Sequence, residues 1–101
     1  MKTLNFAFLV KGEGYDARVH RAYFENEYTK THVLGVEDIA AAQEAARELV
    51  REGVELIELC GAFGQEGARS VAEALDGAVP VGYVTHDKSQ KSLMDALFGS
   101  K

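Results

Sequence analysis

Cysteine, proline and tryptophan are almost missing from this sequence of 101 residues, which holds one Cys, one Pro and no Trp. The single cysteine, Cys60, cannot form a disulfide within the chain, and this favours a reducing compartment, so we expect a cytoplasmic protein. Long apolar runs are missing too, since none approaches the ~20 residues that span a bilayer. We therefore expect no membrane-spanning segment and no membrane partner.

Positive charge is also scarce. Lys and Arg total 11 against 16 Asp and Glu, which gives a formal net charge of -5 at pH 7. A nucleic-acid-binding surface needs clustered basic side chains to neutralise phosphates, and here the basic residues are scattered along the chain. The composition therefore argues against nucleic acid as a partner.

The composition that remains is that of one globular domain. Hydrophobic residues make up 47% and charged residues 27% of the chain, and a length of 101 residues suits a single domain over residues 1–101. Such a chain can bury a core, although a thin one.

Short apolar segments alternate with amphipathic ones. The run from Leu4 to Val10 is almost continuously apolar, which is typical of a strand covered on both faces. Apolar residues recur every three or four positions over 37–52, which predicts a helix that ends at Gly53. The same criteria predict strands over 4–10, 31–36, 54–60 and 81–85, and further helices up to about residue 75 and over 89–98. The last helix is expected to bury Leu93, Met94, Leu97 and Phe98.

Residues 15–30 do not show a clear pattern. Asp16 could cap a short helix that continues through Phe24, or the segment could be an ordered loop. With a helix there, the alternation predicts an α/β fold with a small, mostly parallel four-stranded sheet in the flavodoxin-like order 2-1-3-4, with helices on both faces. Without it, the second strand could pair antiparallel at an edge.

Two stretches resemble a known family. They are Val54–Gly64, followed by Glu66–Arg69, and Val79–His86, and the likeness extends over nearly the whole chain. The sequence resembles a family of short bacterial α/β proteins described only as a domain of unknown function. The resemblance implies a compact α/β domain of this length, and it implies no activity, substrate or cofactor.

Chemically useful residues follow several of the predicted strands. Parallel strands deliver their next loops to one edge of the sheet, where ligands bind in open α/β folds. We therefore expect a site at that edge, whose candidate residues are Lys11, Gly12, Cys60, Gly61, Thr85 and His86.

Cys60 and His86 are candidate catalytic residues. A thiolate that precedes a helix has a lowered pKa, and a nearby His86 could act as its base. In the alternative interpretation, Cys60 is a small apolar core residue and His86 borders the last helix.

Glu58 is a third candidate catalytic residue. The two-residue period of a strand puts Leu56, Glu58 and Cys60 on one face. Burial there would raise the pKa of Glu58 and make it a candidate acid or base. Alternatively, this face is partly open or lies at a subunit contact.

The glycines Gly61, Gly64 and Gly67 lie at three-residue intervals after a strand. Such a turn exposes backbone donors to an anion, although the spacing matches neither the dinucleotide nor the Walker pattern. In the alternative interpretation, the glycines allow tight helix–sheet packing. The isolated histidines lack metal-ligand spacing, so no metal is expected.

Two hypotheses follow. In the first, a small anionic ligand binds at the carboxyl edge, with Lys11 attracting it and the Gly61–Gly64 turn holding it; whether catalysis accompanies binding stays open, and no cofactor is implied. In the second, the chain is a non-catalytic homo-oligomeric or partner-binding module, because the last helix presents a broad apolar face.

Overall fold

The computed structural model describes residues 3–99, which form five strands and three α-helices around a single sheet. In chain order the elements are β1 (Leu4–Lys11), β2 (Arg21–Glu25), β3 (Thr29–Val36), α1 (Ile39–Arg51), β4 (Leu56–Leu59), the 3₁₀ helix η1 (Gly61–Phe63), α2 (Gly64–Leu75), β5 (Val81–Tyr83), the 3₁₀ helix η2 (Lys88–Gln90) and α3 (Lys91–Phe98). No helix in this part of the chain is long and apolar enough to cross a membrane.

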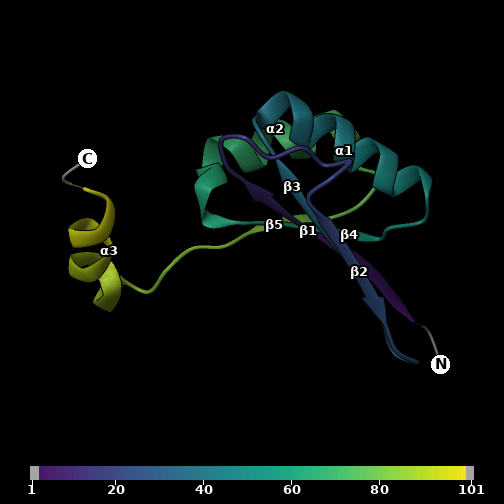
Figure 1. Ribbon diagram of the computed structural model, residues 1–101, viewed down its shortest axis with the longest axis horizontal. Coiled ribbons are helices and arrows are strands. Elements are labelled where there is room, and N and C mark those ends of the chain that lie inside the picture. Colours follow the sequence, from purple (N-terminus) through teal and green to yellow (C-terminus); the bar gives the residue numbers. More distant parts are fainter. Residues whose placement is uncertain (1–2, 100–101) are drawn as a thin grey trace.

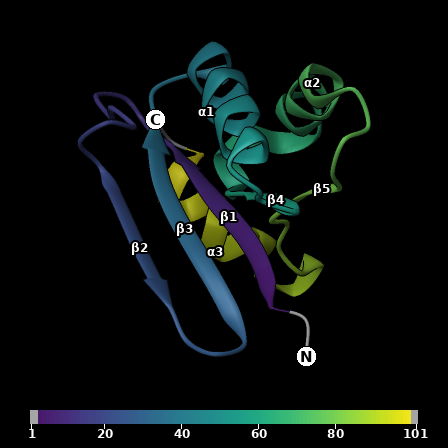
Figure 2. The same cartoon turned by 90° about the vertical axis from the view of Figure 1, so that its right-hand side faces the viewer.

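The sheet is mixed, with the strand order β2-β3-β1-β4-β5 (Figures 1 and 2). β1 lies in the centre and runs parallel to both β3 and β4, β5 runs parallel to β4, and β2 is antiparallel to β3. The α/β class is confirmed, but the prediction of four strands in the flavodoxin-like order 2-1-3-4 is wrong. The reason is that residues 21–25 form a fifth strand, paired in a hairpin with β3.

Residues 15–30 form neither a helix nor only a loop. The backbone carbonyl of Asp16 accepts hydrogen bonds from the N–H groups of Val19 and His20 at 2.9 and 2.7 Å, which makes a single turn. The chain then enters β2, and Asn26 ends that strand because its side chain accepts hydrogen bonds from the next N–H groups of the β2–β3 turn. A turn of this kind favours a hairpin over a continued helix.

The core lies on one face of the sheet. The prediction of helices on both faces is wrong, because α1 and α2 both pack on the same side (Figure 1). Alternate residues of β1, namely Ala7 and Leu9, are fully buried beneath them. α1 begins at Asp38, whose carboxylate accepts a hydrogen bond from the N–H of Ala41 at 2.9 Å. The largest fully buried side chains are Leu9, Val36, Leu49, Ile57, Leu59 and Val71.

The opposite face of the sheet, which we call the open face, carries apolar side chains that no helix covers. By the alternation of strand residues, it holds Phe6, Phe8 and Val10 from β1, which are half-buried. The ring of Tyr15 lies against Gly12 and Gly35, where an added Cβ would come within 2.8 and 2.9 Å of it. These glycines therefore admit an aromatic ring at the carboxyl end of the sheet. Further apolar members of the open face are Leu4, Phe24, Val33 and Leu56.

α3 stands apart from the sheet at the end of an extended segment (Figure 1). None of its residues is buried, and Leu93, Leu97 and Phe98 remain 68%, 60% and 62% exposed. The prediction that this helix buries its apolar side chains is wrong for the described chain. Its apolar residues recur at helical spacing as predicted, but no other element of residues 3–99 covers them.

His32 lies on the helix-covered face of β3. Its Nε2 atom is 3.1 Å from Oδ1 of Asn5, and its ring centroid is 4.7 Å from that of Tyr23. Burial lowers the pKa of His32 below its usual 6.5, the positive charges of Arg21 and Lys30 lower it further, and only Glu52 acts in the opposite direction. The folded protein therefore holds this imidazole in its neutral form more firmly than the unfolded chain does.

We expect the free energy of unfolding to fall as the pH is lowered below about 6.5, because the unfolded chain then binds a proton that folded His32 resists. The stabilisation by neutral His32 is complete above the pKa that His32 has in the unfolded chain. It is lost as the pH falls through the pKa of His32 in the folded protein. Urea unfolding between pH 7.5 and 5, with His32→Gln and the exposed His86→Gln as a matched pair, checks this. An equal pH dependence in wild type and His32→Gln would contradict it.

Candidate functional site

The carboxyl ends of three parallel strands meet at one edge of the sheet. The N–H of Lys11, at the end of β1, donates a hydrogen bond to Sγ of Cys60 over 3.3 Å. On the other side of β4, the N–H of Val84 donates to the carbonyl of Leu59 over 2.9 Å. The loops that follow β1, β4 and β5 therefore start next to one another.

A cleft of about 870 Å³ opens between η1, the end of β5 and α3. It brings together four of the predicted site residues, namely Gly61, Gly64, Thr85 and His86. α3 supplies the far wall with Met94 and Phe98. Lys11, Gly12, Glu58 and Cys60 are not part of this lining.

Cys60 lies between the core and the sheet edge. It is half-buried, packs against the apolar core and precedes η1. His86 is exposed, and no hydrogen bond joins it to Cys60 in the part of the chain that the structure describes. The catalytic roles of Cys60, His86 and Glu58 stay a prediction, and a direct Cys60–His86 pair would require one of them to move.

Glu58 lies on the open face beside β5. Its carboxylate sits so close to Gly82 that any Cβ at that position would collide with Oε1. The absence of a side chain at Gly82 therefore makes room for the Glu58 carboxylate. Glu58 is half-buried rather than enclosed, which agrees with the alternative that this face is partly open.

Lys11 and Gly12 take structural positions at the end of β1. Alternation places the Lys11 side chain on the same face as Leu9, toward the helices. The N–H of Gly12 donates to the carbonyl of Val36 over 2.9 Å, and its missing side chain admits the Tyr15 ring. Their role in ligand binding stays a prediction.

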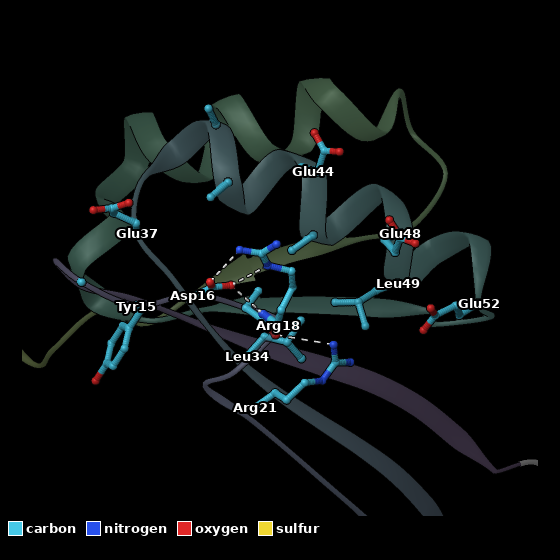
Figure 3. Close-up of a pocket in the computed structure, with 15 residues that line it drawn as sticks. Tyr15, Asp16, Arg18, Arg21, Leu34, Glu37, Glu44, Glu48, Leu49 and Glu52 are labelled. Atoms are coloured by element: carbon cyan, nitrogen blue, oxygen red, sulfur yellow. Dashed lines mark hydrogen bonds and ion pairs between the residues drawn. The ribbon is translucent and has the colours of Figure 1, made fainter.

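Sequence reasoning missed a second hollow, a groove of about 980 Å³ between α1 and the chain that leads into β2 (Figure 3). The Arg18 guanidinium lies in it and is held by both carboxylate oxygens of Asp16, at 3.1 and 2.9 Å. Hydrogen bonding to Arg18 lowers the pKa of Asp16 to about 2. Opposite them, α1 presents glutamates one helical turn apart, and this spacing was the one signal visible in the sequence. The acidic lining residues are Asp16, Glu37, Glu44, Glu48 and Glu52, and the basic ones are Arg18 and Arg21.

The charge of this groove matters for the choice of site. Acidic side chains outnumber arginines in its lining, and the Arg18 charge is already paired with Asp16. An anion would therefore be repelled from the groove, whereas the cleft beside α3 carries a single carboxylate, that of Asp95, whose Oδ2 is 2.7 Å from Nζ of Lys91. No group of three His, Cys, Asp or Glu side chains in residues 3–99 could hold a metal ion.

The fold is that of a small α/β protein with a mixed five-stranded sheet. The chain belongs to a family of unknown function, DUF6506, whose model matches residues 4–99. No curated protein and no solved structure matches it.

We expect alkylation of Cys60 by iodoacetamide to be slower in the native protein than in urea, because the thiol is half-buried. The His86→Ala variant should leave the native rate unchanged, since no hydrogen bond links the two side chains. Mass spectrometry of the alkylated fraction over time measures both. A native rate above the unfolded one that drops in His86→Ala would instead establish an activated nucleophile.

Proposed function

We propose that the protein is a ligand-binding domain whose cleft between η1, β5 and α3 takes a small apolar molecule with one carboxylate group. The observation that carries the proposal is the chemistry of the cleft. Its walls are mainly apolar, with Tyr83 and Val84 on one side and Met94 and Phe98 on the other. Its volume of about 870 Å³ lies in the range of small-molecule sites.

The cleft lining also holds hydrogen-bond donors, at the start of η1 and after β5. Gly61 and Ala62 begin η1, so their N–H groups have no acceptor within that helix. Thr85 and His86 lie in the same lining and add side-chain donors. A carboxylate placed there would meet these donors while the rest of the molecule contacts the apolar wall. The site also lies beyond the carboxyl ends of β4 and β5, where open parallel sheets bind ligands.

Octanoate is a suitable probe because it joins an apolar chain to one carboxylate. In a ¹H–¹⁵N NMR titration we expect the amide signals of Gly61, Ala62 and Thr85 to shift, while that of Gly53, beyond the far end of α1, stays in place. Phe98→Ala should weaken binding about tenfold, as expected for the loss of an aromatic contact. Leu93→Ala is the matched control, because Leu93 lies on α3 outside the lining.

Three outcomes would contradict this proposal. Octanoate could leave all amide signals unmoved at millimolar concentration. The shifts could instead cluster on the open face, around Phe8 and Val33. Finally, Leu93→Ala could weaken binding as much as Phe98→Ala, which would mean that α3 acts as a general apolar surface rather than as one wall of a cleft.

A second candidate function is that of an assembly module, and the open face favours it. Parallel sheets are ordinarily covered on both faces, yet here Phe6, Phe8 and Val33 have no helix over them. α3 offers a second uncovered apolar surface through Leu93 and Leu97. Exposed apolar area of this kind marks a surface that contacts another molecule.

If the open face mediates self-association, Phe8→Asp should shift sedimentation toward the monomer, because it places a charge in the middle of that face. Leu97→Asp tests α3 separately and should leave the fold intact, since the helix has no buried residue. Ala72→Asp, on the exposed side of α2, is the control. Circular dichroism verifies folding. Unchanged self-association in both folded variants would exclude these surfaces.

A further inference from the structure

β2 is an edge strand whose outer side pairs with no other strand of residues 3–99. All five of its residues are exposed, and it pairs with β3 on one side only. In that ladder the N–H of Gly35 donates to the carbonyl of His20, and the N–H of Asn26 donates to the carbonyl of Thr29. Bonding residues alternate with outward-facing ones in an antiparallel pair, so the even-numbered residues of this strand bond to β3.

The odd-numbered residues, Arg21, Tyr23 and Glu25, therefore turn their backbone groups to the free edge. The N–H of Arg21 is used by the carbonyl of Val19 at 3.2 Å. The N–H groups of Tyr23 and Glu25 and the carbonyls of all three residues are left facing outward. Such a row is a template for pairing with another strand.

The sequence of β2 is complementary to itself when read antiparallel. With Tyr23 opposite Tyr23 of a second copy, Arg21 of each chain faces Glu25 of the other, and Ala22 faces Phe24. The outward-facing residues then lie opposite one another, as hydrogen-bonded pairs require. We propose that two copies of this chain associate through antiparallel pairing of their β2 strands about a two-fold axis at Tyr23.

Both faces of the joined sheet support this register. On the helix-covered face, where Tyr23 contacts the ring of His32, the pairing places opposite charges directly across from each other on both sides of the axis. On the open face, it sets the small Ala22 beside Phe24, which is 61% exposed in the single chain. Every contact away from the two-fold axis occurs twice, so the pair of Arg21 with Glu25 forms on both sides of the axis.

The interface is small, which sets its strength. A strand of five residues buries less than the roughly 1,200 Å² of a standard interface. We therefore expect a concentration-dependent dimer that forms between about 10 μM and 1 mM. This proposal uses the free side of β2 and depends neither on the cleft nor on the central open-face residues Phe6, Phe8 and Val33.

Charge reversal tests the register. Arg21→Glu leaves only acidic side chains at these two positions, and Glu25→Arg leaves only basic ones, so each variant alone should dimerise roughly thirtyfold more weakly than wild type. An equimolar mixture of the two variants should form a heterodimer of wild-type strength, because the two acidic side chains of one variant then face the two basic side chains of the other. The double variant R21E/E25R should dimerise as wild type does. Arg18→Glu, a charge reversal outside the strand, is the control.

Sedimentation equilibrium up to about 1 mM measures the association, and hydrogen exchange locates it. The amide protons of Tyr23 and Glu25 should exchange more slowly as the concentration rises in wild type and in the mixture, but not in either single variant. A wild type that stays monomeric at the highest concentration overturns the proposal. So does a dimer that is unaffected by both single reversals, and if that dimer is lost in Phe8→Asp, the open face is the interface instead.

Discussion

Burial of a single face of β1 is the constraint from which the rest of the structure follows. The side chains of Ala7 and Leu9 on β1 are fully buried beneath the two helices, whereas Phe6 and Phe8 on the other face of β1 have no helix over them. α1 reaches this core with alanines, which allow a close approach of helix and sheet. Because both crossover helices lie on one side, only one face of the sheet is covered by helices within one chain. The remaining apolar area is available to a ligand or a partner.

Much of the fold could be predicted because local pattern and tertiary environment agree there. The apolar run at 4–10, the helical period at 37–52 and the strand before Cys60 all correspond to observed elements. β2 could not be found in this way, because all its residues are exposed and its pairing depends on the turn at Asn26 rather than on a periodic pattern. The continuous apolar run in β1 predicts two covered faces, but a run of this kind does not specify what covers them.

The candidate site, too, could be predicted from the sequence only in part. The meeting of the strand ends followed from their parallel direction, and it accounts for the shared lining of Gly61, Gly64, Thr85 and His86. What each glycine faces could not be predicted. Gly12 and Gly82 are both close to side chains of their own chain, the Tyr15 ring and the Glu58 carboxylate. A glycine in a strand signals a close approach, and only the folded chain identifies the approaching group.

The two edges of the sheet differ in a way that limits its growth. β5, at the far edge, has only three residues and directly follows Pro80, which lacks an N–H group, whereas β2 has five residues and no proline. A sheet with two receptive edges can add copies without end and become a fibre. If only the β2 edge accepts another strand, pairing of two copies occupies that edge in both of them, and no further copy can add. If two copies pair through β2 as proposed, the three-residue strand β5 becomes the outer strand at both ends of the joined sheet, and growth by strand pairing would stop there.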